Sequence, residues 1–386
     1  MGSCPWAQEP TNRTAAGGGY PAVGEPRLAP LVSVPWSIPK DFPIPRFPAD
    51  NRPSAEKFEL GRHLFYDKRL SGNGKISCAS CHRQALGFAD SSPLSKGATG
   101  ELTLRNSQHL ANIAWNSTYT WANPTLTSVE RQMSVPLFGE HPVEMGVNDR
   151  NRDAIVARVK ADKRYQGFFR LAFPSQSDPF SWTNIIAAIA TFQRGLITAN
   201  SKFDQYQRGE SKLSDSELRG KDLFYGEKAE CFHCHGGFNF SDQVNHAQSR
   251  HLSSPFHNTG LYSLDEKGSY PAPSNGLFDI TERDEDMGKF RAPSLRNVEV
   301  SGPYMHDGSV ASLGEVLEIY AAGGRNVMHG KFVGDGRKNP NKSELIGTIK
   351  LTKEEQADLV SFLKTLTDYQ FLSDPRFSDP WRKTKH

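Results

Sequence analysis

The chain has 386 residues, more than a single hydrophobic core usually serves, so we expect two or three domains. Its 46 basic and 43 acidic residues nearly cancel, which argues against nucleic acid as the main partner. The longest apolar stretch, residues 185–190, is far shorter than the roughly 20 residues that cross a bilayer, so we predict no transmembrane helix.

The first segment, residues 1–50, is predicted to be a proline-rich arm. It contains ten prolines and shows neither a helical nor a strand period. Because proline locks φ and lacks an N–H donor, we expect this arm to wrap the body of the protein or to stay mobile. No signal peptide is visible at its start. Cys4 is expected to be a plain unpaired thiol; a lipid anchor is the alternative, because Gly2-Ser3-Cys4 resembles the end of a bacterial lipoprotein processing site.

A short internal repeat follows the arm. Residues 61–66 (Gly-Arg-His-Leu-Phe-Tyr) are echoed by residues 220–225 (Gly-Lys-Asp-Leu-Phe-Tyr), and a pair of cysteines soon follows each copy. We expect both copies to be helical. The repeat indicates two homologous halves, which we place at residues 51–205 and 206–386.

Further helices are predicted from apolar spacing and from capping boxes, in which a Ser or Thr hydroxyl and a Glu carboxylate satisfy free backbone N–H groups. Bulky apolar side chains recur at helical spacing in residues 182–197, and capping boxes begin at Ser214, Ser312 and Thr352. Residues 246–291 are polar and rich in Gly, Pro and Asp, so we expect mainly loop there. Because strand signals are weak throughout, the predicted fold class is mainly α with long irregular loops.

Two cysteine pairs carry the strongest chemical signal in the chain. Each is followed directly by histidine in a C-x-x-C-H motif, which is typical of c-type haem attachment: Cys78, Cys81 and His82 form the first, and Cys231, Cys234 and His235 the second. In this spacing, two thiols can add to the vinyl groups of a porphyrin while the imidazole binds iron. A zinc site would usually bring both pairs within about twenty residues, and a thioredoxin-like pair would need a βαβ context; the sequence shows neither.

We therefore predict two tandem cytochrome c-like domains, each with one covalently bound c-type haem. The bacterial machinery that attaches this haem works outside the cytoplasmic membrane, so we also expect the protein to be periplasmic.

Several stretches resemble the bacterial di-haem cytochrome c peroxidase/MauG family. They are residues 58–70, 104–107 (Leu-Arg-Asn-Ser), 142–146 (Pro-Val-Glu-Met-Gly), 290–297 (Phe-Arg-Ala-Pro-Ser-Leu-Arg-Asn) and 302–308 (Gly-Pro-Tyr-Met-His-Asp-Gly). The resemblance runs from about residue 50 to the C-terminus. It implies that the haem bound by His82 reacts with peroxide and that the haem bound by His235 transfers electrons.

The resemblance also predicts how each iron is capped. Reductively activated peroxidases of the family have a distal histidine on the first haem, at the position that Ala98 occupies here, so we expect this haem to be open at rest. The methionine that caps the second haem in those enzymes aligns with Tyr320, on the helix that follows Ser312, and MauG-type enzymes have tyrosine there. Met305 and His306 are the competing candidates for this ligand. These features are similar to the MauG/MbnH-like subgroup.

The distal pocket and the bridge between the haems follow from the same resemblance. Glu144 matches the family's distal glutamate, which moves a proton from one peroxide oxygen to the other, and Gln132 and Pro136 match the residues beside it. Two additional residues between Pro136 and Glu144 leave Glu140 as a rival. Trp121 matches the tryptophan that relays an electron hole between the haems, and a packing role is its alternative.

A calcium ion between the domains is also implied. The matching ligands are the side chain of Asn106 and the backbone carbonyls of Ser301 and Pro303, which are the hard oxygen donors that Ca²⁺ prefers.

Together these features predict a MauG/MbnH-like di-haem peroxidase. It would use hydrogen peroxide to form a high-valent bis-haem state, which oxidises a residue of a partner protein, with tryptophan the expected one, by long-range electron transfer. The alternatives are a cytochrome c peroxidase that detoxifies hydrogen peroxide with an electron donor, and a di-haem electron-transfer cytochrome.

Overall fold

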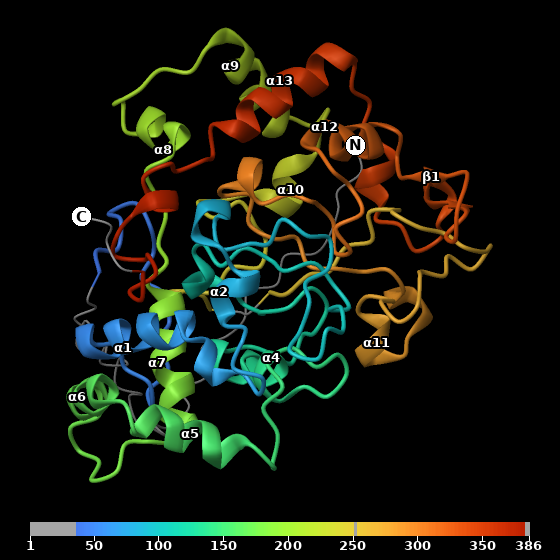
Figure 1. Ribbon diagram of the computed structural model, residues 1–386. Coiled ribbons are helices and arrows are strands. Elements are labelled where there is room, and N and C mark those ends of the chain that lie inside the picture. The colour runs from blue at the N-terminus through green and yellow to red at the C-terminus, as the bar shows by residue number, and fades with distance from the viewer. Residues whose placement is uncertain (1–35, 251–252, 383–386) are drawn as a thin grey trace, which may run out of the picture. The chain divides into compact units, whose positions relative to one another are not determined.

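The computed structural model describes residues 36–250 and 253–382, which Figure 1 shows as helices joined by long irregular segments. The α-helices are α1 (Ala55–Tyr66), α2 (Cys78–Cys81), α3 (Val129–Gln132), α4 (Ser134–Phe138), α5 (Arg152–Lys160), α6 (Lys163–Ala172), α7 (Trp182–Arg194), α8 (Lys202–Gln207), α9 (Asp215–Phe224), α10 (Cys231–His235), α11 (Phe278–Thr281), α12 (Leu313–Ala321) and α13 (Lys353–Lys364). Short 3-10 helices lie at Lys68–Leu70, Gln84–Leu86, Ile113–Trp115, Asp284–Asp286, Val298–Val300, Gly336–Lys338, Glu344–Gly347 and Phe371–Ser373.

Strand structure in these residues is confined to β1 (Asn326–Val327) and β2 (Gly334–Asp335), which pair antiparallel with Asn326 opposite Asp335. The predicted mainly-α fold class is confirmed. No helix in the described ranges has the length and apolar character needed to span a bilayer.

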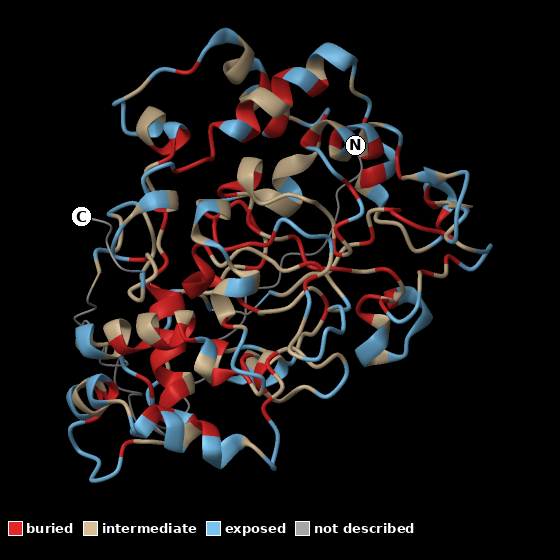
Figure 2. Ribbon diagram, in the orientation of Figure 1, coloured by how far each residue is buried: buried red, intermediate tan, exposed pale blue. Residues whose placement is uncertain are grey.

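Helices α1 and α7 form the core of the first half. Helix α1 begins after Ser54, whose hydroxyl accepts a hydrogen bond from the Lys57 N–H at 3.2 Å, and it packs along α7. Helix α7 is buried along most of its length, as Figure 2 shows. Where the helices cross, a Cβ atom on Gly61 would overlap the backbone carbonyl oxygen of Ala188. The missing side chain at Gly61 therefore allows the two backbones to touch.

The second copy of the repeat forms an equivalent helix pair. Helix α9 opens with the predicted capping box at Ser214, α13 opens with the one at Thr352, and the two helices pack along each other. A Cβ atom on Gly220 would overlap the carbonyl oxygen of Asp358, just as one on Gly61 would meet α7. The sequence repeat thus corresponds to one crossing geometry that is used twice.

One predicted boundary differs from the structure. The helix expected over residues 182–197 ends at Arg194, because the backbone of the next residues pairs with Asn112 instead of continuing the helix: the Asn112 N–H donates to the Leu196 carbonyl at 2.9 Å. Residues 246–291, expected to be mainly loop, are mainly irregular where they are described; the exceptions are α11, a single turn too short to produce a helical period, and the 3-10 helix Asp284–Asp286.

The described part of the proline-rich arm, residues 36–50, contacts the body of the protein. The indole Nε1 of Trp115 donates to the Pro43 carbonyl at 2.8 Å, and the rings of Phe42 and Trp115 meet edge to face with centroids 5.5 Å apart. Cys4, for which a lipid anchor was the alternative to a plain thiol, lies outside the described residues.

The C-terminal tail returns to the first core. Phe371 and Phe377 are buried in the same cluster as α1 and α7, and the Trp381 Nε1 donates to the His63 carbonyl at 3.0 Å. The division into halves at residues 51–205 and 206–386 remains a prediction.

Candidate functional site

The first C-x-x-C-H motif forms the short helix α2 and the residue after it. Both cysteines are unpaired thiols. The His82 Nδ1 lies 2.8 Å from the carbonyl oxygen of Phe88, to which it can donate. This bond orients the imidazole and leaves Nε2 as the nitrogen that can bind iron. Phe88 presents its carbonyl from a left-handed backbone conformation, with φ of 65°.

The second motif repeats this arrangement in α10. The His235 Nδ1 lies 3.1 Å from the carbonyl oxygen of Phe240, which also has a left-handed φ, of 50°. Both cysteines of this motif are again unpaired thiols. Two motifs that share one local geometry, including the orientation of the histidine, are what a pair of c-type haems requires.

A cavity of about 300 Å³ lies beside the second motif. Its lining is mainly apolar and includes Cys231, Cys234, His235 and Tyr320. Burial, followed by the neighbouring Cys234, raises the pKa of the Cys231 thiol to about 12. Three buried polar atoms that line this cavity have no hydrogen-bond partner among the described residues: Gln108 Nε2, His109 Nδ1 and Arg291 Nε. An apolar cavity with a C-x-x-C-H motif and unsatisfied polar atoms fits a haem, which has an apolar ring and two carboxylates.

Tyr320 lies in this cavity near the end of α12, which opens with the predicted capping box at Ser312. Burial, followed by the charges of Cys234 and Cys231, raises the pKa of its hydroxyl above the ordinary value, so the side chain is close to both thiols. No hydrogen bond to this hydroxyl is found within residues 36–250 and 253–382. An iron ion here would have to displace the phenol proton in order to bind the oxygen.

The rival ligands Met305 and His306 line the same cavity. The His306 ring is stacked on Phe290, with centroids 3.7 Å apart and planes inclined by 11°. Burial lowers the pKa of His306 to about 4, so its imidazole is neutral at neutral pH.

Glu144 lies close to the first motif. Its charge contributes to raising the pKa values of the Cys78 and Cys81 thiols, after burial, which is the main cause for both. Burial also raises the pKa of Glu144 itself. Glu140, its rival from sequence, is exposed.

The loop that carries Ala98 runs along the Glu144 segment. The Ala98 N–H donates to the Glu144 carbonyl at 2.6 Å, and a Cβ atom on Gly146 would lie 3.2 Å from the Ala98 methyl group. Pro136 accepts from the Met145 N–H at 2.8 Å, so α4 contacts the same segment from another direction. Gln132 ends α3, directly before α4.

Trp121 lines the cavity beside the second motif and contacts the loop that contains Asn106. Its Nε1 donates to the Asn106 carbonyl at 2.7 Å, and its own carbonyl accepts from the Arg291 N–H at 2.8 Å. The candidate calcium ligands Asn106, Ser301 and Pro303 line the same cavity as Trp121. The Asn106 amide nitrogen donates to two backbone carbonyls, which leaves its Oδ1 available for a cation.

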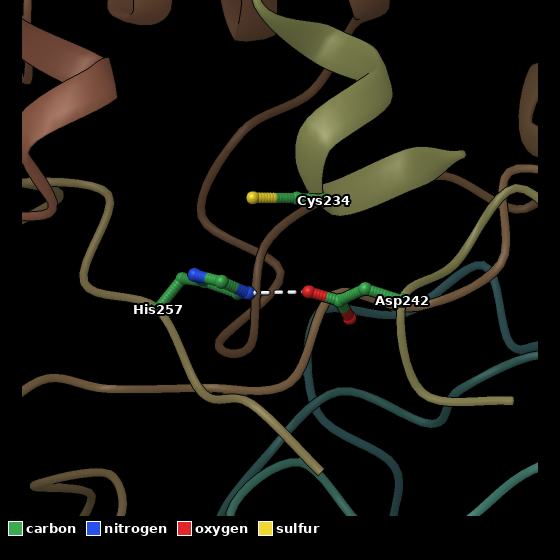
Figure 3. A group of neighbouring side chains, drawn as sticks. All are labelled: Cys234, Asp242 and His257. Atoms are coloured by element: carbon green, nitrogen blue, oxygen red, sulfur yellow. Dashed lines mark hydrogen bonds and ion pairs between the residues drawn. The ribbon is translucent and has the colours of Figure 1, made fainter. Parts of the chain in front are cut away.

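The structure also brings His257 and Asp242 beside Cys234, as Figure 3 shows. The Nε2 of His257 lies 2.6 Å from Oδ2 of Asp242. The pair was not predicted, because His257 lies in residues 246–291, which were expected to be mainly loop, and no sequence motif joins it to Asp242. The three side chains are spaced like metal ligands, but a thioether bond to haem would occupy the Cys234 sulfur, so we assign no metal to them.

Comparisons with known proteins agree with this geometry. A family model described as di-haem cytochrome c peroxidase matches residues 55–212. The cytochrome-c peroxidase IdrP1 of Pseudomonas sp. (strain SCT) is 35% identical over 373 residues, which cover 93% of this chain and 89% of that protein. The methylamine utilization protein MauG of Methylorubrum extorquens is 33% identical over 331 residues, which cover 85% of this chain and 82% of that protein.

A solved structure described as a MauG-like protein associated with microbial copper homeostasis is 56% identical and superimposes with a TM-score of 0.89, covering 90% of this chain and 99% of that one. The fold and the relatives define an oxidoreductase of the peroxidase class. The chain belongs to the di-haem cytochrome c peroxidase family that includes MauG, as its resemblance predicted, and the family implies two c-type haems.

Proposed function

We propose that this protein is a MauG-type peroxidase that uses hydrogen peroxide to oxidise a residue, with tryptophan the expected one, of a partner protein. The observation that carries the proposal is the position of Tyr320, which lines the same cavity as Cys231, Cys234 and His235 of the second motif. A phenolate ligand is a hard donor that favours oxidised iron, whereas methionine favours the ferrous state. A tyrosine at this position therefore suits an enzyme that stores oxidising equivalents.

When bound, the two haems supply the iron at which peroxide reacts and the sites at which two oxidising equivalents are held. His82 would hold the first iron, and His235 and Tyr320 the second. Glu144 accepts a proton from hydrogen peroxide and returns it to the departing oxygen, and its raised pKa brings it nearer to neutral pH, where proton transfer in both directions is easiest. Pro136, through its hydrogen bond to the Met145 N–H, holds the Glu144 segment.

Trp121 conducts electrons between the two sites. Its hydrogen bonds to Asn106 and Arg291 fix the indole at the wall of the second cavity. A calcium ion held by the Asn106 side chain and by the carbonyls of Ser301 and Pro303 would stabilise the wall of the cavity that contains Trp121. Gln132, at the end of α3 next to α4, would contribute to the pocket in which peroxide reacts.

The proposed partner is a protein, which this enzyme would meet in the periplasm. A residue of that partner would give up electrons by way of Trp121, so the partner and peroxide would not need to share one pocket. The 56% identity with a MauG-like protein supports this assignment over a large part of the chain.

The test is the reaction of the fully oxidised holoprotein with hydrogen peroxide. We expect a rapid and long-lived change in the optical spectrum without prior reduction, because Ala98 replaces the histidine that would block the first iron. If the optical spectrum changes only after one haem has been reduced, the proposal is contradicted.

A cytochrome c peroxidase that draws electrons from a small donor protein is the second candidate. It is favoured by the relative IdrP1, which is named for that activity. Rapid steady-state turnover with reduced cytochrome c as sole donor would support this candidate. A protein whose ferric haems bind neither peroxide nor cyanide would instead be an electron-transfer cytochrome.

A further inference from the structure

Arg291 is a buried arginine without a carboxylate partner. Only 4% of its surface is exposed, and no acidic side chain of the described ranges forms an ion pair with it. Its Nη1 donates to Gln108 Oε1 at 3.2 Å, and its Nε has no hydrogen-bond partner in the part of the chain that the structure describes. Asp242 acts on it only from a distance, and the Asp242 carboxylate is already bound to His257.

Two other buried arginines each pair with a carboxylate. Arg194 contacts both carboxylate oxygens of Glu130, at 2.5 and 2.6 Å. Arg296 contacts both oxygens of Asp204, at 2.9 and 3.0 Å. Because an unpaired buried charge is strongly destabilising, Arg291 needs a counter-charge, and no carboxylate in residues 36–250 and 253–382 pairs with it.

The charge on Arg291 persists at neutral pH. Burial lowers the pKa of its guanidinium to about 10, which still leaves it protonated. His109 adds no competing positive charge, because burial lowers its pKa to about 4 and its Nε2 lies 2.7 Å from the Ser294 carbonyl, to which it donates.

Arg291 and Gln108 face the cavity of the second motif. Both line the same space as Cys231 and His235, and the Gln108 Nε2 is a second buried donor without a partner. A c-type haem is attached through its vinyl groups, so its two propionate carboxylates remain free to meet such donors. A planar guanidinium with an amide beside it is suited to binding a carboxylate.

We propose that Arg291 and Gln108 bind a propionate carboxylate of the haem attached to Cys231 and Cys234, and that this ion pair raises the reduction potential of that haem. The positive charge favours the reduced iron, which carries one positive charge fewer, and it keeps the carboxylate ionised. The inference rests on haem attachment at this site and is independent of what the enzyme oxidises.

The test is a spectroelectrochemical titration of the two-haem holoprotein, without peroxide, between pH 5 and pH 8. In Arg291→Gln we expect a lower midpoint potential for the haem that is capped at both faces. We also expect a new dependence of that potential on pH, because the carboxyl group now titrates in this range. Arg194→Gln is the matched control: it breaks a buried ion pair and lowers stability, and it should leave both potentials unchanged.

The conservative variant Arg291→Lys keeps the charge and should restore most of the potential. If Arg291→Gln does not accumulate with two haems, Gln108→Leu is measured instead. We expect its midpoint potential to be lower than that of the parent protein, by less than in Arg291→Gln. Potentials and pH dependence identical to those of the parent protein, in whichever of these two variants is measured, would overturn the inference. Loss of the peroxide reaction alone would count against the proposed function and leave this assignment standing.

Discussion

At the scale of single residues, Glu144 and Glu140 lie four positions apart and differ in environment. Burial raises the pKa of Glu144, and its charge is felt by the thiols of Cys78 and Cys81, whereas Glu140 is exposed to solvent. The Pro-Val-Glu-Met-Gly resemblance already favoured Glu144, but two additional residues before it kept Glu140 open. The fold favours Glu144, which is half-buried and close to the first motif, where a carboxylate could exchange protons with peroxide.

Glu144→Gln is expected to slow the reaction of the oxidised protein with hydrogen peroxide by about 10²–10⁴-fold, which is the usual effect of removing a general acid–base group. Stopped-flow spectroscopy measures this rate. Glu140→Gln is the control and should react at the parental rate. A normal rate in Glu144→Gln together with a slow one in Glu140→Gln would reverse the assignment.

The protonation state of Glu144 is expected to set how the rate of the peroxide reaction depends on pH. Glu144 must be ionised in order to accept a proton, and burial raises its pKa above the ordinary value. The rate should therefore fall on acidification, with an inflection at a higher pH than the value of about 4.3 that is usual for a glutamate. This inflection should be absent from the residual rate of Glu144→Gln.

Ala98→His tests the claim that the first iron is open. Ala98 lies against the Glu144 segment, so an imidazole at this position would lie beside the residue proposed to act on peroxide. We expect the oxidised variant to lose its high-spin signal and to react with peroxide only after one haem is reduced. Ala98→Ser, which offers no strong iron ligand, should keep the parental behaviour; loss of the reaction in both variants would show that bulk alone matters.

At the scale of elements, the two helix pairs share one contact. Gly61 on α1 meets the Ala188 carbonyl on α7, and Gly220 on α9 meets the Asp358 carbonyl on α13. The two C-x-x-C-H histidines repeat a second feature, a hydrogen bond to the carbonyl of a phenylalanine with left-handed φ. These correspondences extend the six-residue sequence repeat to the helices and loops around each haem site.

Gly61→Ala and Gly220→Ala are each expected to lower the free energy of unfolding by about 1–3 kcal/mol, because the added methyl group forces two backbones apart. Denaturant titration of the holoprotein measures this. Gly167→Ala, in α6, has open space around the new Cβ and should be neutral or stabilising by up to about 1 kcal/mol. Equal effects at all three positions would contradict a close crossing.

Sequence predicted the elements that have a local signal. The capping boxes at Ser214, Ser312 and Thr352 are present, because each depends on residues three positions apart. The return of Phe377 and Trp381 to the first core has no such signal, because it depends on contacts more than 300 residues away in the chain. Arg291 lies in residues 290–297, which resemble the family. That no described carboxylate pairs with it depends on the positions of its neighbours, which the sequence does not predict.

At the scale of the whole molecule, the account requires that two sites share oxidising equivalents. Trp121 is at the wall of the second cavity and is fixed by hydrogen bonds from its ring and its backbone. Trp115 is buried in contact with Phe42 and Phe238, away from these bonds, and so provides a comparison.

Trp121→Phe should leave the resting spectra of both haems unchanged and slow the spread of oxidation from the first haem to the second, because phenylalanine is harder to oxidise than tryptophan. Stopped-flow spectra after peroxide addition measure this step. Trp115→Phe should lower stability without slowing the spread. A parental rate in Trp121→Phe would assign that residue to packing alone.

Low-temperature electron paramagnetic resonance of the resting, fully oxidised protein reports the spin state, and hence the ligands, of each iron. With the first iron open and the second held by His235 and Tyr320, one high-spin and one low-spin ferric signal are expected, and Tyr320→His should alter only the low-spin signal. Two low-spin signals in the parent protein, or a low-spin signal that Tyr320→His leaves untouched, would contradict the account.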